Sequence, residues 1–166
     1  MKISLVIFDL DGVLVDACEW HRSALNEALK EVCNYEISLE DHYETFNGLP
    51  TRVKLRKLTD LGVLPSDKHD EVYAKKQELT VSTIEKHAKI RPEKISLMHY
   101  LRDKGLYIAC YTNSIYETAT LMLDKTGVLE YMDCLVTNQD VEKTKPHPEG
   151  YDFLVRKFNI DKNNVV

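Results

Sequence analysis

The stretch "ISLVIFDLDGVLVD", residues 3–16, sets the direction in which the rest of the chain is interpreted. Ile3–Phe8 has the length and apolar character of a parallel strand that is covered on both faces. Two carboxylates two residues apart, Asp9 and Asp11, follow directly, and Gly12 then lets the backbone turn. Like charges at the end of a buried strand destabilise a fold unless a cation meets them. The stretch therefore predicts a functional site at the carboxyl end of the first strand.

The composition is that of an ordinary globular protein and excludes several classes of function. Of the 166 residues, 43% are hydrophobic and 30% are charged, and the formal net charge is -5. A nucleic-acid-binding domain normally carries a basic face, so this balance argues against one. No apolar run approaches the length of a membrane span, and charges near the N-terminus favour a first strand over a signal peptide. We therefore expect neither nucleic acid nor a membrane as partner.

The cysteines indicate the compartment. They form no C-x-x-C pair and show no zinc-finger spacing, and Cys110 and Cys134 lie inside apolar, strand-like runs, which predicts buried thiols. This use of cysteine fits a reducing environment and predicts a cytoplasmic protein. The other two cysteines are Cys18 and Cys33.

Residues 16–87 carry helix signals only. Apolar side chains recur at helical spacing from Ala17 to Cys33, and Ser38 stands where it would cap a helix start. Ser66 is expected to cap a long helix that ends at about Lys86. The helix between them is expected to present one leucine face, formed by Leu55, Leu58 and Leu61.

From Pro92 onward, helices and strands alternate. The expected elements are a helix from Pro92 to Gly105, a strand Leu106–Tyr111, a helix closed by Gly127, a strand Cys134–Thr137, a helix Tyr151–Phe158 and a strand opening at "NNVV". Such alternation implies a parallel sheet with helices on both faces. The predicted fold class is α/β: a Rossmann-like parallel sheet built from residues 1–15 and 88–166, with an all-helical insertion at 16–87.

Polar residues follow each predicted strand of the sheet. Asp9 and Asp11 follow the first strand, Thr112 and Asn113 the second, and Lys145 lies in the loop after the third. Ligands bind beyond the carboxyl ends of the strands in open α/β sheets, so these side chains are expected to meet. The set suits phosphoryl transfer: Asp9 would attack phosphorus and Asp11 would act as acid and base. Thr112 and Lys145 would hold phosphoryl oxygens, and the hard oxygen ligands favour Mg²⁺.

Three motifs in this order resemble those of the haloacid dehalogenase superfamily. They are "FDLDGVLVD" (8–16), "YTNS" (111–114) and "KPHP" (145–148). The insertion after the first motif resembles the helical cap of the subfamily that contains β-phosphoglucomutase and small sugar phosphatases. The resemblance implies a Mg²⁺-dependent phosphatase of a small phosphorylated metabolite, for which a sugar phosphate is one candidate. Dehalogenases lack the second acid, so Asp11 favours phosphoryl chemistry.

The resemblance also implies a role for each matching residue. Asp9 is the nucleophile and a metal ligand, and Asp11 is the acid/base that gives its backbone carbonyl to the metal. Thr112, Asn113 and Lys145 bind phosphate. Taken singly, these residues have plainer readings: an acidic turn that faces solvent, a helix N-cap at Thr112 and a surface lysine.

Other residues are candidates at the helical insertion. Asp16 and His21 fall where the subfamily often has an Asp and a His at the entry to the cap. Arg52 is a candidate substrate contact, although packing for His21 and a solvated helix face for Arg52 are equally open. Two other functions stay open: a β-phosphoglucomutase-like phosphotransferase that isomerises its substrate, and a catalytically incompetent chain.

The last alternative rests on the fourth motif of the superfamily, an acidic pair that completes the Mg²⁺ site after the next strand. The sequence reaches Val166 where that strand is expected to begin. Asp140 and Glu142 are weaker substitutes for the missing carboxylates. An exposed edge on the first strand, and with it low stability, is also expected.

Overall fold

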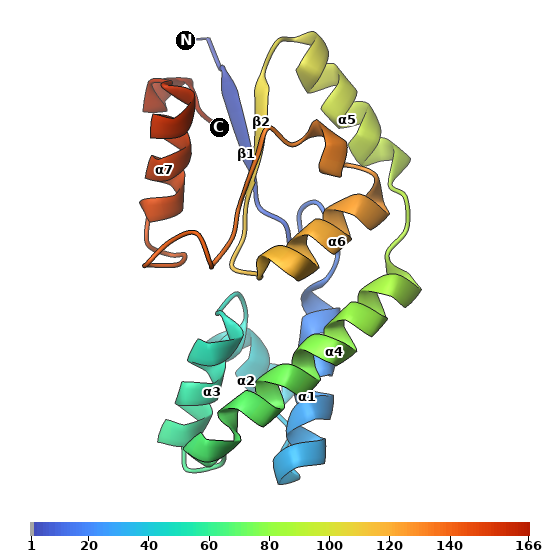
Figure 1. Cartoon of the computed structure of the whole chain (residues 1–166), viewed down its shortest axis with the longest axis vertical. Coiled ribbons are helices and arrows are strands. Elements are labelled where there is room, and N and C mark those ends of the chain that lie inside the picture. Colours follow the sequence, from blue (N-terminus) through green and yellow to red (C-terminus); the bar gives the residue numbers. More distant parts are fainter. Residues whose placement is uncertain (1) are drawn as a thin grey trace. The chain divides into compact units, whose positions relative to one another are not determined.

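The computed structural model describes residues 2–166 (Figure 1). Its sheet is parallel, with the strand order β1-β2-β3. The register pairs Leu5 with Tyr107 and Ala109 with Cys134. The three strands are β1 (Leu5–Phe8), β2 (Tyr107–Tyr111) and β3 (Cys134–Val136). This is the parallel sheet that the alternating pattern predicts.

The described residues divide into two compact units. The sheet unit comprises the residues up to Asp16 together with Ala88–Val166, and the helical unit is Ala17–His87. The assignment of the two units as a core and an inserted cap stays a prediction. In the part of the chain that the structure describes, no helix is long and apolar enough to cross a membrane.

Helices cover both faces of the sheet (Figure 1). Alternate residues of β2 point to opposite faces, so Ala109 and Tyr111 pack with Leu154 of α7 in one buried cluster. Within the sheet unit, the α-helices are α5 (Pro92–Asp103), α6 (Tyr116–Thr126) and α7 (Glu149–Phe158), and the 3₁₀ turns are η3 (Leu129–Tyr131) and η4 (Lys162–Asn164). Pro92 opens α5 and Gly127 closes α6, as predicted.

The outer edge of β1 is not open along its whole length, which corrects the expected exposed edge. The amide of Ser4 donates to the carbonyl of Asn164 (2.8 Å), and the amide of Ile7 donates to that of Val166 (2.7 Å). In return, the amide of Val166 donates to the carbonyl of Leu5 (3.0 Å). The stretch "NNVV" (163–166), which is predicted to open a further strand, therefore pairs with β1 in parallel through Val165 and Leu5.

The helical unit contains helices and turns only. Its elements are α1 (Cys18–Cys33), α2 (Leu39–Asp41), the π-helical turn η1 (His42–Phe46), α3 (Thr51–Asp60), the 3₁₀ turn η2 (Ser66–Lys68) and α4 (His69–His87). Ser38 caps α2, as predicted, because its hydroxyl accepts from the amide of Asp41. Helix α1 packs along α4.

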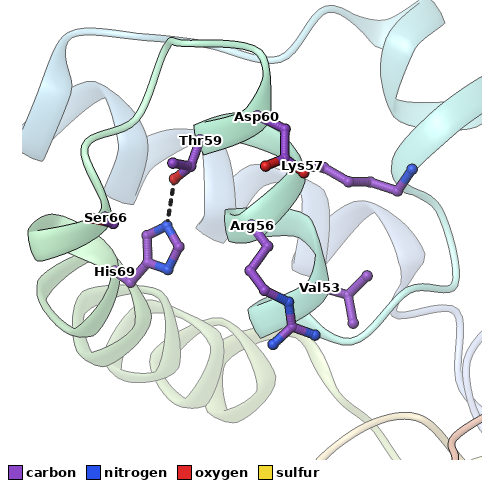
Figure 2. A pocket seen from close by; sticks show the side chains of 7 residues that line it. All are labelled: Val53, Arg56, Lys57, Thr59, Asp60, Ser66 and His69. Carbon is purple, nitrogen blue, oxygen red and sulfur yellow. Dashed lines mark hydrogen bonds between the residues drawn. The ribbon is translucent and has the colours of Figure 1, made fainter.

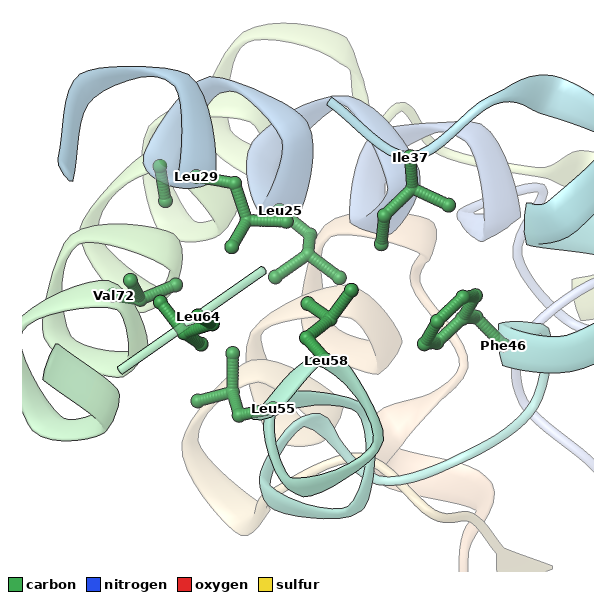
Figure 3. Close-up of a cluster of buried hydrophobic side chains, with 9 residues drawn as sticks. Leu25, Leu29, Ile37, Phe46, Leu55, Leu58, Leu64 and Val72 are labelled. Carbon is green, nitrogen blue, oxygen red and sulfur yellow. The ribbon is translucent and has the colours of Figure 1, made fainter. Parts of the chain in front are cut away.

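A single hydrophobic cluster forms the centre of the helical unit (Figure 3). Leu55 and Leu58 of α3 are completely buried in it. The other buried members are Leu25, Ala28, Leu29, Ile37, Phe46, Leu64 and Val72. Burial of this apolar surface stabilises the unit, and it does so above all for α3, because an isolated helix of 10 residues would not persist in water.

Three details of the sequence-based prediction are wrong. Leu61 is 64% exposed, because α3 ends at Asp60 and the chain turns before Leu61 reaches the cluster. Ser66 lies inside η2 and caps nothing, since Pro65 holds the N-cap position. Cys134 is only partly buried, although Cys110 is fully buried as expected. All four cysteines are in the described part of the chain, and none forms a disulfide.

Candidate active site at the carboxyl edge of the sheet

The end of β1 places two carboxylates at the edge of the sheet. The strand stops at Phe8, and Gly12 then adopts a φ of +84°, a conformation that side chains with a Cβ rarely accept. The amide of Gly12 donates to the carbonyl of Val15 (2.7 Å), which closes a tight turn. Asp9 and Asp11 are therefore presented by backbone that is fixed on both sides.

Lys145 meets Asp9 across this edge. Its Nζ lies 2.6 Å from Oδ1 of Asp9 and 3.0 Å from the carbonyl oxygen of Tyr111, at the end of β2. The Asp9 side chain is 44% exposed, whereas that of Lys145 is 18% exposed. The amide of Leu10 also donates to Asp9 Oδ1 (2.9 Å). Asp9 thus combines a nearby positive charge with access from solvent.

Asp11 is held by hydroxyl groups. Its Oδ2 accepts from Ser114 Oγ (3.1 Å) and, more weakly, from Thr112 Oγ1 (3.4 Å). Thr112 is fully buried, and its hydroxyl also accepts from the amide of Ser114 (3.0 Å). The Thr112 side chain thus faces Asp11. Ser114 stands in "YTNS" but is not among the predicted site residues, since a serine after a strand most simply caps a helix.

Asn113 joins the end of β2 to the loop that carries Lys145. Its Nδ2 donates to the carbonyl of Lys145 (3.2 Å), and its Oδ1 accepts from the amide of the same residue (3.1 Å). The structure therefore brings Asp9, Asp11, Thr112, Asn113 and Lys145 together at one edge of the sheet. No pattern in the sequence indicated that Asn113 would bond to the main chain of Lys145.

The buried thiol beneath this site is not a competing nucleophile. Cys110 precedes Tyr111 on β2 and pairs with Phe8 in the sheet. Burial raises the pKa of Cys110 far above its ordinary value, and the Asp9 carboxylate raises it further, while Lys145 partly opposes this shift. A thiol must be ionised to attack, so Cys110 stays protonated and serves packing.

The oxygen ligands present suit a hard cation only in part. Among residues 2–166, no three His, Cys, Asp or Glu side chains gather into a metal-binding cluster. Oδ2 of Asp140 accepts from both the amide and the hydroxyl of Thr137 (2.7 and 2.6 Å), so this oxygen is engaged within its own loop. A role of Asp140 or Glu142 as a substitute ligand stays a prediction. Mg²⁺ commonly takes one or two carboxylates and completes its shell with water and phosphate. Asp9 and the main chain of Asp11 fit that minimal set.

His21 and Arg52 belong to the helical unit, and the contacts described for them lie within it. His21 Nδ1 lies 3.3 Å from Nζ of Lys76, a lysine that is only 7% exposed. Arg52 pairs with Asp70 (3.1 Å) and lies over the ring of Tyr73. Both residues therefore have a structural explanation, and their contact with substrate stays a prediction. Asp16 is in the sheet unit and forms an ion pair with Arg91.

The helical unit also carries a pocket of about 370 Å³ that contains none of the predicted site residues (Figure 2). Thr59 Oγ1 donates to the carbonyl of Leu64 and lies 2.7 Å from His69 Nε2. Since the hydroxyl proton is used, His69 must donate from Nε2. These groups fasten the turn after α3. The lining residues are Val53, Arg56, Lys57, Thr59, Asp60, Ser66 and His69.

A comparison with known families agrees with the family that the three motifs predict. A model of the haloacid dehalogenase-like hydrolase family matches residues 6–166. The chain belongs to this family. The predicted membership is thus confirmed, and with it the expectation that the protein is a hydrolase of the haloacid dehalogenase superfamily.

Relatives within the family include enzymes with a named activity. The pyrophosphatase PpaX of Bacillus velezensis is 23% identical over 173 residues, an overlap that covers 99% of this chain and 73% of that enzyme. A phosphoglycolate phosphatase of Nitrosospira multiformis is 27% identical over 171 residues, covering 100% of this chain and 74% of that enzyme. The chain therefore spans about three quarters of the length of these two haloacid dehalogenase-like relatives.

Solved structures of the family share the fold. The crystal structure of β-phosphoglucomutase from Clostridium difficile superposes with a TM-score of 0.83 at 21% identity, and covers 99% of this chain and 74% of that chain. At this level of identity the likeness is one of fold. It confirms the predicted α/β, Rossmann-like architecture.

Proposed function

We propose that this haloacid dehalogenase-like hydrolase is a Mg²⁺-dependent phosphatase that hydrolyses a phosphomonoester of a small metabolite. The observation that carries the proposal is the pairing of a solvent-accessible Asp9 with the ammonium of Lys145 at 2.6 Å. A second carboxylate, that of Asp11, stands two residues further on and is held by two hydroxyls. A nucleophile, an acid/base and a cation are the groups that phosphoryl transfer through an enzyme carboxylate requires.

Asp9 is assigned as the nucleophile. Its Oδ1 accepts bonds from Lys145 and Leu10, so we assign attack on phosphorus to Oδ2. A bond forms between this oxygen and phosphorus while the bond from phosphorus to the leaving oxygen breaks, and Asp11 gives that oxygen a proton. In the second step Asp11 takes a proton from water while the water oxygen bonds to phosphorus. The bond between phosphorus and Oδ2 of Asp9 breaks, which releases inorganic phosphate and restores the Asp9 carboxylate.

The phosphoryl oxygens are assigned to Thr112, to Lys145 and to the main-chain amide of Asn113, because the carboxamide of Asn113 bonds to the main chain of Lys145. The Lys145 charge offsets the repulsion between the Asp9 carboxylate and an incoming phosphate dianion. Asp9 and the backbone carbonyl of Asp11 would hold Mg²⁺, which when bound neutralises charge on the phosphoryl group. Catalysis by this set consists mainly of placing charge where the transferred group develops it.

The substrate class is inferred from the relatives, whose names indicate small phosphorylated compounds, phosphoglycolate and pyrophosphate. A sugar phosphate stays a candidate. His21 and Arg52 are the residues of the helical unit that we assign to the part of the substrate remote from phosphorus. Fold alone does not fix a substrate, so the choice depends on side chains of this kind.

The test is Mg²⁺-dependent release of phosphate from an aryl phosphate, from phosphoglycolate and from an aldose 1-phosphate by residues 1–166. Chelation of the metal should abolish release. Asp9→Asn should lower kcat on the order of 10³-fold or more, because it removes the nucleophile. Asp152→Asn, an exposed carboxylate on α7, is the matched control and should leave the rate unchanged.

Three results would contradict the proposal. Full activity in Asp9→Asn would remove Asp9 as nucleophile. Isomerisation of the aldose phosphate without free phosphate would assign the chain to the mutases. No turnover of any substrate would identify residues 1–166 as catalytically incompetent.

A further inference from the structure

The loop that carries Lys145 is held by side chains from outside it. It connects β3 to α7, and its first part is fastened by Glu149, whose carboxylate accepts from the amides of Glu142 (2.8 Å) and Lys143 (3.0 Å). These bonds lower the pKa of Glu149, so the carboxylate is charged when it accepts them. Lys145 itself lies beyond the reach of these two bonds and is fastened separately.

Asn113 is the residue that fastens Lys145. Its carboxamide makes one bond to the carbonyl and one to the amide of Lys145, at 3.2 and 3.1 Å. The main chain of Asn113 is in turn tied to the end of β3, because Asn138 Nδ2 donates to the carbonyl of Asn113 (2.8 Å). Asn113, two residues after β2, is thus bonded on one side to the loop of Lys145 and on the other to Asn138, two residues after β3.

We propose that Asn113 is a positioning residue, whose side chain fixes the backbone of Lys145 and thereby holds the Lys145 ammonium against Asp9. The proposal deepens the function proposed above, since it concerns the cation of the same site. Only a primary amide of this length donates and accepts at once to the two groups of one peptide residue. Serine and alanine cannot make both bonds, and aspartate can make only the one in which it accepts.

Fixing the backbone matters because lysine has a long and flexible side chain. Its ammonium sits on a four-carbon stem with several rotatable bonds, so a displaced backbone allows many positions away from Asp9. The start of α7, directly after this loop, packs tightly against β2. A Cβ on Gly150 would lie 2.4 to 2.7 Å from ring atoms of Tyr111. Lys145 Nζ in turn lies 5.1 Å from the centre of that ring. Asn113 supplies the polar restraint beside this apolar contact.

The experiment measures the exposure of the Lys145 ammonium without relying on turnover. The full chain is labelled briefly with acetic anhydride, and the acetylation rate of Lys145 is compared by mass spectrometry with that of Lys157 on α7. In Asn113→Ala we expect Lys145 to be acetylated about tenfold faster, the factor that corresponds to losing two neutral hydrogen bonds. The rate at Lys157 should not change.

Gln139→Ala is the matched control. Its side-chain oxygen caps α6 by accepting from the amide of Tyr116 (2.7 Å). The variant therefore loses one carboxamide hydrogen bond near the site, but no hydrogen bond to Lys145. Asn113→Asp is nearly isosteric and keeps the acceptor for the Lys145 amide, so it should give an intermediate rate. It also serves if Asn113→Ala fails to fold. An unchanged Lys145 rate in the folded Asn113 variants, or equal acceleration by Gln139→Ala, would overturn the proposal.

A second measurement tests whether the effect of Asn113 on activity passes through Lys145. In the phosphatase assay, Asn113→Ala should lower kcat/KM about tenfold alone, and should cost nothing further when Lys145 is already methionine. If Asn113→Ala is equally harmful with and without Lys145, its effect does not pass through Lys145. Should Asp9→Asn stay active while labelling behaves as expected, the proposed function fails and the positioning role of Asn113 stands.

Discussion

His42 is a buried titratable side chain of the helical unit. It lies in η1 and is 2% exposed. Burial lowers the pKa of His42 below its ordinary value of 6.5, and the positive charges of Lys54 and Arg22 lower it further. The carboxylate of Glu19 acts in the opposite direction and is the weakest of these influences. His42 is therefore neutral in the folded protein at pH 7.

This neutral histidine makes stability depend on pH. The pKa of His42 is lower in the folded protein than in the unfolded chain. At pH values between these two pKa values the unfolded chain binds more protons, so stability falls as the pH is lowered through that range. We expect the free energy of unfolding to drop between pH 7.5 and 5.5 with a slope of at most about 1.4 kcal/mol per pH unit from this group. Urea titrations at several pH values measure the slope.

His42→Gln cannot take up a proton and should flatten that slope, even though it lowers stability at every pH by disturbing the packing. The pH range lies above the ordinary pKa of the carboxylates, so Glu19 and Glu149 do not contribute to it. A slope as steep in His42→Gln as in the natural sequence would assign the dependence to another group.

At the scale of the elements, Asn26 makes in the helical unit the same pair of hydrogen bonds that Asn113 makes in the sheet unit. It lies in the middle of α1 and is 6% exposed. Its Nδ2 donates to the carbonyl of Ile37 (2.9 Å), and its Oδ1 accepts from the amide of Ile37 (3.1 Å). The loop before α2 is thereby joined to α1, and the Ile37 side chain is placed in the hydrophobic cluster.

Asn26→Ala should destabilise the protein by about 2–4 kcal/mol, because it leaves a buried amide and a buried carbonyl without partners. Chemical denaturation followed by circular dichroism measures the loss. Glu27→Ala, at the neighbouring exposed position of α1, is the control and should change stability by no more than about 0.5 kcal/mol. Similar losses in both variants would indicate a helix-propensity effect and contradict the role of Asn26.

Across the whole chain, the sheet unit is assembled from segments far apart in the sequence. Residues 164–166 add main-chain hydrogen bonds to the outer edge of β1, and Val165 packs against the cluster that contains Leu5 and Leu154. The edge of a β-sheet with unpaired amides and carbonyls attracts other chains. Residues 164–166 therefore cover part of the outer edge of the first strand.

Removal of residues 164–166 should lower stability by about 2–4 kcal/mol, from three main-chain hydrogen bonds and the packing of Val165. It should also increase aggregation. Thermal unfolding with simultaneous light scattering measures both effects. Val166→Lys keeps the main chain and changes a side chain that is 69% exposed, so it should behave like the natural sequence. A shortened chain that melts and scatters like the full one would refute this role for the edge.

Much of the architecture could be predicted because local patterns and the tertiary structure agree. The apolar run before Asp9 predicts a strand, which the structure confirms as β1, although only Leu5 of that strand is fully buried. The alternation after Pro92 left a parallel sheet as the consistent arrangement. Predictions failed where a boundary depended on packing. Leu61 fits the helical period of α3, but the helix ends one residue earlier and leaves it in solvent. Ser66 has the right chemistry for a cap, yet it lies within a 3₁₀ turn that precedes α4.

The sequence by itself determined the family, the fold class and which residues stand at the carboxyl ends of the strands, because these depend on periodicity and on residue types at short spacing. Only the tertiary structure decided which of those residues touch. Lys145 meets Asp9 from 136 positions away, and the amides of Asn26 and Asn113 bond to single distant residues. Such contacts depend on the positions of loops after the sheet has formed, and local sequence carries no signal of that geometry.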